Sequence, residues 1–386
     1  MMGEGRNMES TPIRAAEFFA GIGLVRTALE RVKGAQVQVV WANDIKQAKR
    51  DAYVANFPAA EDHFLVRDIR LVKAPELPED IELATSSFPC IDLSLAGNRR
   101  GLVGEQSGMF WEFAKILEGM SPRPSVVLLE NVHGFATSHG GADLAAALRR
   151  LSDLKYSLDV FAVDARHFVP QSRPRMFIVG IRKDKLPGNA RFDVPPVSDV
   201  RPAWVKAIHE KHRDTLSMHY VDLPGLPEGP QDLDGFVEED VSPGLWWGED
   251  RVEAFVKSLS DVQKVRFQAL LTADTISYRT AYRRTRQGVS VWELRKDGIA
   301  GCLRTTGGGS SRQALVRLGR GSKAVRWMTP REYANLMGAH DYKLVAGTPN
   351  QQLFGFGDAV VVDVIEWIGN YYLLPALRPD DAVRTE

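Results

Sequence analysis

The sequence predicts an α/β protein with a parallel sheet and a second, smaller domain, and three observations support this fold class. Residues 13–23 are apolar and end at two glycines, and residues 24–32 follow with helical spacing. A strand, a glycine turn and a helix in this order bring backbone N–H groups against a ligand. Residues 125–129 are wholly apolar, as is typical of a parallel strand that is buried on both faces. After residue 187 prolines become frequent, which indicates a change of domain.

Composition sets limits on the class of protein. The chain has 386 residues, 44% of them hydrophobic, which is enough for a full core and about two domains. No run of eighteen apolar residues and no apolar signal core at the start are found, so we expect a soluble, cytoplasmic protein without membrane contact. The two cysteines, Cys90 and Cys302, lie far apart and have no metal-ligand spacing, so we predict a reduced protein and no metal site.

Charge is segregated along the chain. Lys plus Arg and Asp plus Glu both number 49, so the net charge of zero gives no hint of a partner. Residues 222–250 nevertheless contain nine acids and no Lys or Arg, whereas residues 264–326 contain fourteen basic residues and three acids, a net charge of +11. Tyr278, Tyr282 and Trp292 are interleaved, as is typical of a phosphate-binding surface. The alternative is a solvated face that pairs with the acidic segment. Trp246 and Trp247 receive no predicted role.

The remaining elements follow from hydrophobic patterning. Pro330 and Glu332 mark the start of a helix. Residues 351–358 are polar and interrupted by glycines. Further strands are predicted at residues 37–42, 81–84, 158–165, 176–181 and 289–294, and helices at 110–120, 329–337 and 359–368.

Residues 81–101 form the stretch around which the rest of the chain is organised. Proline fixes φ, so Cys90 follows Pro89 on a stiff corner just beyond a strand. In a parallel sheet, ligands and chemistry collect at this place. A glycine-interrupted segment with Asn98, Arg99 and Arg100 follows, which reads as a mobile loop able to close over an anion. We therefore predict a nucleophile with a basic lid; the alternative is a small buried core residue.

Other polar side chains follow predicted strands. Asp44 closes the second strand about 20 residues after the glycines, which suits a ribose hydroxyl pair, although a helix N-cap is an alternative. Glu130 directly follows the buried strand at the edge that also carries Cys90; a cap or an ion-pair partner is its alternative. Arg173 and Arg175 are two apart on an extended segment and therefore share a face, so both can point into one site or form a solvated pair.

Together these segments resemble the DNA (cytosine-5) methyltransferase family. The matching motifs cover roughly residues 12–182 and 326–370. The Pro-Cys, Glu-Asn-Val and Gln-x-Arg-x-Arg elements in this order are the most specific. In chain order the motifs are Phe19-Ala20-Gly21-Ile22-Gly23, Asn43-Asp44, Asp68-Ile69, Phe88-Pro89-Cys90, Ser107-Gly108-Met109-Phe110, Glu130-Asn131-Val132, Gln171-Ser172-Arg173-Pro174-Arg175, Arg331-Glu332 and Phe356-Gly357-Asp358-Ala359-Val360.

The resemblance implies a domain organisation and a setting. A Rossmann-like, AdoMet-dependent methyltransferase domain would span residues 12–190, and a mainly β or irregular target-recognition domain residues 191–335. Residues 336–378 would complete the catalytic domain, with the closing helix beside the first strand. The implied partner is double-stranded DNA, bound by a monomer in the nucleoid of a bacterial or archaeal cytosol. The implied setting is restriction–modification or phage defence.

The resemblance also implies a cofactor, S-adenosylmethionine. Phe19 would stack near its adenine, Gly21 and Gly23 would approach the methionine moiety, Asp44 would bind the ribose, and Asp68 with Ile69 would meet the adenine edge. The residues expected at the cofactor are Phe19, Ala20, Gly21, Ile22, Gly23, Asp44, Ile45, Asp68, Ile69, Pro89, Met109, Ala359 and Val360.

The implied chemistry explains the residue types. Attack of a Cys90 thiolate on cytosine C6 would make C5 nucleophilic. Glu130 would bond N3 and the exocyclic amine, and Arg175, with Arg173, would bond O2. A stacked base cannot present C6, so it must be flipped out. The residues expected at DNA are Asn98, Arg99, Arg100, Arg283, Arg284, Arg286, Arg304, Thr305, Thr306 and Gly307.

The chain departs from the residues usual in the family in three places, and there are three alternative functions. The family usually has Glu where Asp44 stands, Asn-Ser where Asp358-Ala359 stands, and often Gln where Ile91 stands. A tRNA methyltransferase and a non-catalytic DNA-binding member remain as alternatives. A dinucleotide oxidoreductase would share the fold, but it leaves the Pro-Cys motif and the arginine pair unexplained. Cys302 is expected to be a buried bystander.

Overall fold

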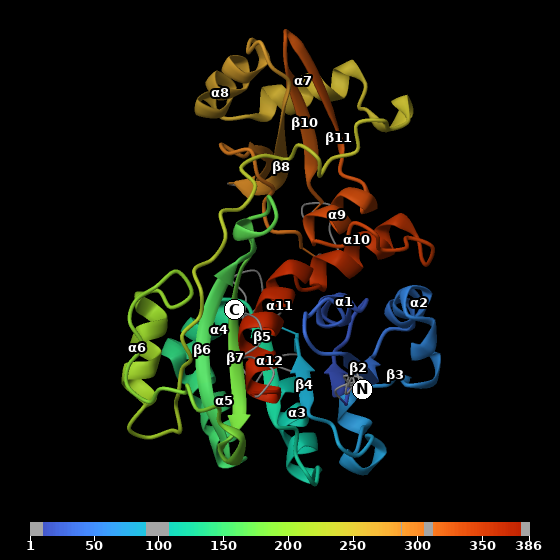
Figure 1. Cartoon of the computed structure of the whole chain (residues 1–386). Helices are drawn as coiled ribbons and strands as arrows, with labels where there is room; N and C mark the ends of the chain where they lie inside the picture. Colours follow the sequence, from blue (N-terminus) through green and yellow to red (C-terminus); the bar gives the residue numbers. More distant parts are fainter. Residues whose placement is uncertain (1–10, 90–107, 287, 305–311, 380–386) are drawn as a thin grey trace, which may run out of the picture.

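The computed structural model describes residues 11–89, 108–286, 288–304 and 312–379. Its larger part is a seven-stranded sheet with the strand order β3-β2-β1-β4-β5-β7-β6 (Figure 1). Only β7 runs against its neighbours in this sheet, because it pairs antiparallel with both β5 and β6. The seven strands are β1 Ile13–Phe18, β2 Val37–Asp44, β3 Phe64–Val66, β4 Leu83–Ser86, β5 Val126–Asn131, β6 Tyr156–Asp164 and β7 Pro174–Arg182.

The order of the strands indicates where a ligand would bind. β1 lies between β2 and β4, so the chain reverses its direction of winding there, and ligands bind beyond the carboxyl ends of strands at such a point. The carboxyl ends of β1, β2, β4 and β5 meet along this edge. The α/β class and the predicted strands are thereby confirmed, with shifts of a few residues at their ends.

Helices cover both faces of the large sheet, because side chains alternate along each strand. On β1, Ile13 and Ala15 pack with α1 and the C-terminal helices, whereas Ala16 and Phe18 pack with α3 and α5. The C-terminal helices end beside β1, where the guanidinium of Arg378 donates to the carbonyl oxygen of Thr11 over 3.2 Å. The predicted closing helix is confirmed. The helices named here are α1 Leu24–Leu29, α3 Met109–Gly119, α5 Ala142–Asp153, α11 Val362–Ile368 and α12 Leu374–Leu377.

Residues 349–377 are long and apolar enough to cross a membrane by length and composition. Two thirds of the relevant window (67%) is buried inside the structure, as in a core helix. The first helix of this run is α10, Pro349–Asp358, so the glycine-interrupted stretch at 351–358 is helical. Gly355 permits a close approach there, because a Cβ at this position would lie 2.8 Å from the side chain of Ile22. The glycine packs the helix against the loop after β1.

The smaller domain is a four-stranded antiparallel sheet of order β11-β10-β8-β9, and Figure 1 shows it above the carboxyl edge of the large sheet. α7 and α8 pack on one of its faces around Phe255 and Phe267. Its elements are α7 Glu249–Ser258, α8 Asp261–Leu271, β8 Ser277–Arg286, β9 Val289–Leu294, β10 Ala314–Gly319 and β11 Ser322–Trp327. The chain then enters α9, Pro330–Leu336, through the expected capping box of Thr329 and Glu332.

The domain boundary at residue 191 is too early. α6, Ala203–His212, packs on β6 of the large sheet. Arg201, just before this helix, binds the buried Asp159 of β6 over 2.6 Å, and Met218, just after it, forms a β-bridge with Leu158. The prolines that suggested a new domain therefore mark an extended segment on the surface of the first one. The remaining helices are α2 Gln47–Asn56 and α4 Gly134–Thr137.

Candidate active site

A glycine loop follows β1, at the point where the chain reverses its direction of winding. Phe19, Gly21 and Gly23 have φ values of 57°, 60° and 86°. A Cβ on Gly23 would lie 2.8 Å from the ring of Phe57, so both the conformation and the space require glycine. The amide of Gly21 donates to Asp44 Oδ2 over 3.2 Å. The loop is thus tied to the carboxylate that ends β2.

Asp44 is buried, with 6% of its surface exposed, and its carboxylate is surrounded by N–H donors. Oδ1 accepts the amide of Lys46 over 3.0 Å, and Oδ2 lies 3.4 Å from Lys49 Nζ. The same ammonium lies 3.2 Å from Asp358 at the end of α10. Burial lowers the pKa of Lys49, but Asp44 and Asp358 outweigh it and hold that pKa above its ordinary value. Two of the three departures from the family pattern therefore contact one lysine, which sequence reasoning missed.

The other expected cofactor residues divide into two groups. Phe19, Ala20, Gly21, Pro89, Met109 and Ala359 are half-buried along the carboxyl edge, and Ile45 is 59% exposed. The side chains of Ile22, Ile69 and Val360 are instead packed in the core, so only their backbone groups could meet a cofactor. Asp68 accepts hydrogen bonds from Arg70, which hold the pKa of its carboxyl below the usual range.

These residues fit a nucleoside cofactor by their chemistry. The backbone N–H groups of a glycine loop at a helix start suit a polar or charged group. A carboxylate at the end of the second strand suits the two hydroxyls of a ribose. Among the described residues, no three His, Cys, Asp or Glu side chains gather in a way that could bind a metal ion.

Glu130 and Arg175 form the ion pair at the centre of the edge. Glu130 lies near the end of β5, and Arg175 lies at the start of the neighbouring β7. Arg175 Nε lies 2.8 Å from Glu130 Oε1, with 13% and 11% of the two side chains exposed. Because β7 runs antiparallel to β5, its first residues lie at the carboxyl end of β5. The pair is therefore pre-formed and faces the edge that also carries the glycine loop.

Arg173 has a different environment from Arg175. It is 2% exposed, and its guanidinium donates to the carbonyl oxygens of Leu303, Gly357 and Ala359 over 2.7, 3.0 and 2.6 Å. Gln171, two residues earlier, accepts the amide of Leu303 over 3.1 Å and donates to the carbonyl of Leu336 over 2.7 Å. Arg173 therefore joins the end of α10 to the segment after β9. Its guanidinium donates to these backbone carbonyl oxygens and is not directed at the place proposed for a base.

Cys302, expected to be a buried bystander, contacts both arginines. Its Sγ lies 3.3 Å from Arg173 Nη1 and 3.8 Å from Arg175 Nη2, so the two arginines do share a face, as expected. Burial raises the pKa of the Cys302 thiol, but the two guanidiniums outweigh it and lower the pKa below its ordinary value. Sequence spacing could not reveal this contact, because it depends on how the small domain returns to the large one.

The expected nucleophile, Cys90, lies outside the described residues, as do Asn98, Arg99 and Arg100. The chain leading to it is anchored: the side-chain amide of Asn131 donates to the carbonyl oxygen of Phe88 over 3.3 Å. Asn131 is 3% exposed and directly follows Glu130. One residue pair at the end of β5 thus provides both the carboxylate and the anchor of the Pro-Cys segment.

Two of the arginines expected at DNA, Arg283 and Arg284, lie on opposite faces of the small sheet. Arg283 lies over the rings of Trp292 and Trp327, on the side of the small sheet that carries α7. Arg284 points to the other side, where its Nε lies 3.2 Å from Glu293. Neighbouring residues on a strand face opposite ways, so grouping these arginines was wrong. Arg304 is exposed, Arg286 ends β8, and Thr305, Thr306 and Gly307 lie outside the described residues.

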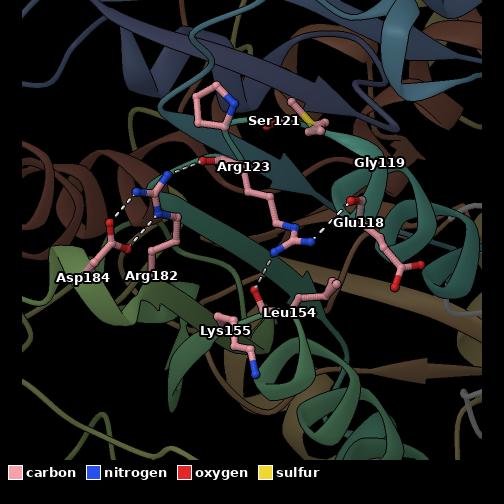
Figure 2. A pocket seen from close by; sticks show the side chains of 10 residues that line it. Glu118, Gly119, Ser121, Arg123, Leu154, Lys155, Arg182 and Asp184 are labelled. Carbon is pink, nitrogen blue, oxygen red and sulfur yellow. Dashed lines mark hydrogen bonds and ion pairs between the residues drawn. The ribbon is translucent and has the colours of Figure 1, made fainter.

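A cavity of about 410 Å³ lies at the opposite edge of the large sheet, between the start of β6 and the end of β7 (Figure 2). Arg182 binds Asp184 and the carbonyl of Arg123, and Arg123 donates to the carbonyls of Glu118 and Leu154. Both guanidiniums are therefore already satisfied by protein acceptors, and we assign this cavity no role.

The fold and the site define a Rossmann-like methyltransferase. A family model described as C-5 cytosine-specific DNA methylase matches residues 13–372, so the chain belongs to that family and is a cytosine-5 methyltransferase. The chain is 26% identical over 361 residues to the type II methyltransferase M.Bsp6I of Bacillus sp. (strain RFL6), covering 92% of this chain and 97% of the relative. It is 25% identical over 366 residues to the type II methyltransferase M.HhaI of Haemophilus parahaemolyticus, covering 95% of each.

Solved structures support the fold. The methyltransferase EhMeth of Entamoeba histolytica superimposes with a TM-score of 0.61 at 15% identity, covering 96% of this chain and 99% of that one. The Dnmt2 methyltransferase of S. pombe superimposes with a TM-score of 0.59 at 16% identity, covering 95% and 99%. At such identities the likeness concerns the fold alone.

Proposed function

We propose that this protein transfers a methyl group from S-adenosylmethionine to C5 of a flipped-out cytosine in duplex DNA, through a covalent bond between Cys90 and C6. The observation that carries the proposal is the Glu130–Arg175 pair, 2.8 Å apart at the carboxyl edge of the sheet. The family description names both cytosine C5 and DNA, and it supports the choice of base and of polymer.

The pair suits the polar edge of cytosine. This edge presents O2 as an acceptor, N3 as an acceptor and the exocyclic amine as a donor, side by side. A guanidinium donates to O2, while the adjacent carboxyl group donates to N3 when protonated and accepts from the amine when ionised. Arg175 and Glu130 are therefore assigned to O2 and to N3 with the amine. Arg173 positions the segments around them rather than touching the base.

Each of these residues is then assigned a step of the reaction. The Cys90 thiolate adds to C6 while the protonated carboxyl group of Glu130 donates its proton to N3, and the enamine formed makes C5 a nucleophile. When bound, S-adenosylmethionine supplies an electrophilic methyl sulfonium. Loss of the C5 proton returns the electron pair to the ring, breaks the bond between Cys90 and C6, and releases the thiolate. A stacked base cannot present C6 to a thiolate, so the cytosine must leave the duplex first.

The cofactor would be bound by Gly21 and Asp44, with Lys49 fixing the carboxylate. Asp44 has its Oδ2 between the Gly21 amide and the ammonium of Lys49, and these contacts fix the orientation of its carboxylate at the end of β2. A carboxylate in this position accepts hydrogen bonds from two hydroxyls. This arrangement supports a nucleoside cofactor.

Methyl transfer to defined substrates tests the proposal. The protein is incubated with S-adenosylmethionine carrying a labelled methyl group and either unmethylated duplex DNA or a tRNA transcript. We expect label in DNA at C5 of cytosine, none with Cys90→Ala, and a covalent adduct with DNA that contains 5-fluorocytosine. Methylation that survives in Cys90→Ala would disprove the mechanism, and label in tRNA alone would replace DNA by RNA as the substrate. Bisulfite sequencing of DNA from expressing cells then gives the target sequence.

A further inference from the structure

Three tryptophans meet on the helix-covered face of the small sheet. Trp247 precedes α7, Trp292 lies on β9 and Trp327 ends β11, and their ring centroids are 5.2 to 5.5 Å apart. β9 and β11 are opposite edges of the sheet. Their rings can meet because the inner strands carry the small, fully buried Ala281 and Ala314 between them. The tryptophans therefore form a platform over the centre of the sheet.

Three arginines lie on this platform. The guanidinium of Arg251, from α7, lies 3.9 Å from the centroid of Trp247 and 5.5 Å from that of Trp327. Arg312, just before β10, lies 5.4 Å from the centroid of Trp327. Arg283 lies 5.7 Å from Trp292 and 5.9 Å from Trp327. The three positive charges come from three different elements and share one set of rings.

Two acidic residues of the small domain form ion pairs with other arginines. Glu293 pairs with Arg284 on the opposite face of the sheet, and Asp297 pairs with Arg295. Burial lowers the pKa of Arg251, and the neighbouring Arg283 lowers it further. Burial likewise lowers the pKa of Arg312, as does Arg251. Like charges at close range repel one another, so a bound anion would relieve the repulsion of Arg251 with Arg283 and with Arg312.

Donors without acceptors mark the same place. Nε of Arg312 and Nε1 of Trp247 are buried, and neither has a hydrogen-bond partner within the described part of the chain. A buried donor without a partner costs free energy that a bound oxygen would recover. A cation–π stack explains why one arginine lies on a tryptophan. It does not explain why three arginines share three tryptophans, or why the buried Nε of Arg312 and Nε1 of Trp247 have no acceptor among the described residues.

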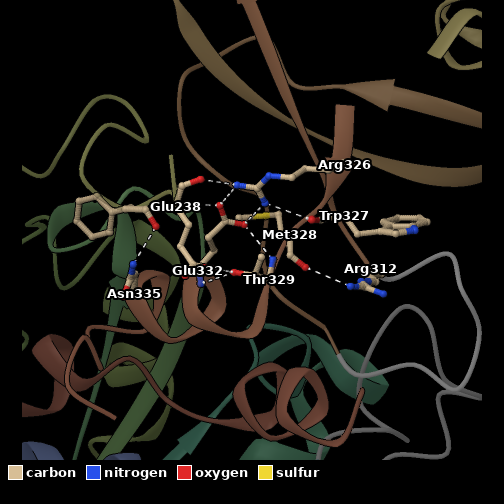
Figure 3. Close-up of polar contacts among 9 residues, drawn as sticks. Glu238, Arg312, Arg326, Trp327, Met328, Thr329, Glu332 and Asn335 are labelled. Carbon is tan, nitrogen blue, oxygen red and sulfur yellow. Dashed lines mark hydrogen bonds and ion pairs between the residues drawn. The ribbon is translucent and has the colours of Figure 1, made fainter. Parts of the chain in front are cut away.

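The position of the cluster relates it to the candidate active site. Figure 3 shows Arg312 beside Trp327, donating to the carbonyl of Met328 directly before α9. The buried ion pair of Arg326 and Glu332, 2.8 Å apart, fixes the small sheet to this helix. The cluster thus lies where the small domain meets the large one.

We propose that Arg251, Arg283 and Arg312, stacked on Trp247, Trp292 and Trp327, form a binding site for a backbone phosphodiester of the nucleic acid substrate. Stacked guanidiniums present their N–H edges outward, and arginine matches phosphate with paired hydrogen bonds. The proposal rests on the proposed function only in taking a nucleic acid as substrate. It gives Trp247 and Arg251 a role that the sequence did not suggest.

The salt dependence of binding tests the site independently of methylation. Each phosphate contact adds about 0.9 to the slope of log affinity against log salt concentration. Because the site would bind one phosphodiester, Arg251→Gln/Arg312→Gln should flatten the slope for a fluorescein-labelled duplex by about one unit, and Arg251→Gln alone by no more than that. The matched control is Lys257→Gln/Lys323→Gln, which removes two exposed charges from α7 and β11 and should leave the slope unchanged.

The outcomes separate the possible roles. An unchanged slope in the double variant, with a lower melting temperature, would make the cluster a stabilising stack and overturn the proposal. Arg251→Gln replaces an exposed residue, so it keeps the test valid if the double variant does not fold. Saturable quenching of tryptophan emission by inorganic phosphate alone would indicate a free-anion site and also overturn it. If methyl transfer to DNA is absent but the slope change appears with RNA, the phosphate site stands and only the choice of polymer fails.

Discussion

Lys49 Nζ lies 3.2 Å from Asp358 Oδ2, although the two residues come from opposite ends of the chain. The same ammonium lies 3.4 Å from Asp44, so it is shared between the end of β2 and the end of α10. The neighbours of Asp358, Gly357 and Ala359, accept hydrogen bonds from Arg173. A continuous set of polar contacts therefore runs from the candidate cofactor carboxylate to the arginines beside the candidate base site.

This relationship gives the first prediction. Lys49→Met should remove the ammonium between Asp44, which is buried, and Asp358, whose side chain is 38% exposed, and the loss of a partner for the buried carboxylate costs about 1–3 kcal/mol. We expect a lower melting temperature and an affinity for S-adenosylmethionine reduced by about tenfold or more, which corresponds to about 1.4 kcal/mol. Calorimetric titration and thermal melts with and without the cofactor measure both quantities.

Asp358→Asn provides the matched test of the Lys49 prediction. In the Lys49→Met background it removes one of the two repelling charges, so we expect it to recover part of the lost affinity. Lys46→Met, on an exposed side chain beside the same helix, should change neither quantity. Equal affinities for wild type and Lys49→Met would show that the lysine is dispensable for the cofactor.

The second prediction concerns the ion pair of the candidate base site. Glu130→Gln keeps the shape but cannot transfer a proton, so methyl transfer should slow by roughly 10²–10⁴, the range of general acid–base contributions. Binding of the duplex should change little, because the proposed phosphate contacts lie elsewhere. Single-turnover rates and anisotropy titrations give the two numbers. A rate within about threefold of wild type would return Glu130 to a structural role.

The two arginines should behave differently, which is the third prediction. Arg175→Lys keeps a charge near Glu130 but cannot donate with the same geometry, so the rate of methyl transfer should fall while the melting temperature stays near that of wild type. Arg173→Lys leaves several buried carbonyl oxygens without donors, at about 1–3 kcal/mol for each. It should lower the melting temperature and weaken binding of both substrates. The same loss of stability in both variants would contradict the separate roles inferred here.

The sequence predicted the large sheet well, because its buried strands are short and continuously apolar. The family resemblance implied that Glu130 and Arg175 would meet at one base, but the strand pattern did not, because Arg175 precedes its predicted strand and only the antiparallel direction of β7 brings it to the edge where β5 ends. The sequence could not predict Lys49 with Asp358 or Cys302 with Arg173, because these contacts depend on how distant segments pack. Arg283 and Arg284 are a different case: alternation along a strand would have separated them, and charge counting alone grouped them.

The domain boundary failed for a physical reason that composition hides. Prolines indicate an extended chain, but an extended chain can cover an existing domain as readily as it can lead to a new one. Arg201 binds the buried Asp159, which fixes the segment before α6 to β6. Among the described residues of 191–335, the buried apolar side chains of β8 to β11, α7 and α8, such as Phe255 and Phe267, form a core separate from that of the large sheet.

The last prediction concerns pH and a carboxyl group beneath the glycine loop. Glu17 on β1 is 1% exposed and accepts a hydrogen bond from the hydroxyl of Tyr53. Burial raises the pKa of Glu17 from 4.5 to about 7, despite the opposing effects of Tyr53 and Arg26. A folded-state pKa above the unfolded one means that the protonated form stabilises the fold. This stabilisation is complete below about pH 4.5 and is lost as the pH rises through about 7.

Glu17→Gln should remove this dependence, because the amide cannot ionise and its carbonyl oxygen still accepts from Tyr53. The difference in unfolding free energy between variant and wild type should therefore grow in favour of the variant from pH 5 to pH 8, by up to about 3 kcal/mol. Urea titrations of both proteins at several pH values measure the difference, which cancels the contributions of all other titrating groups. A difference that stays constant with pH would show that Glu17 is already ionised in the folded protein, with Arg26 as its counter-charge.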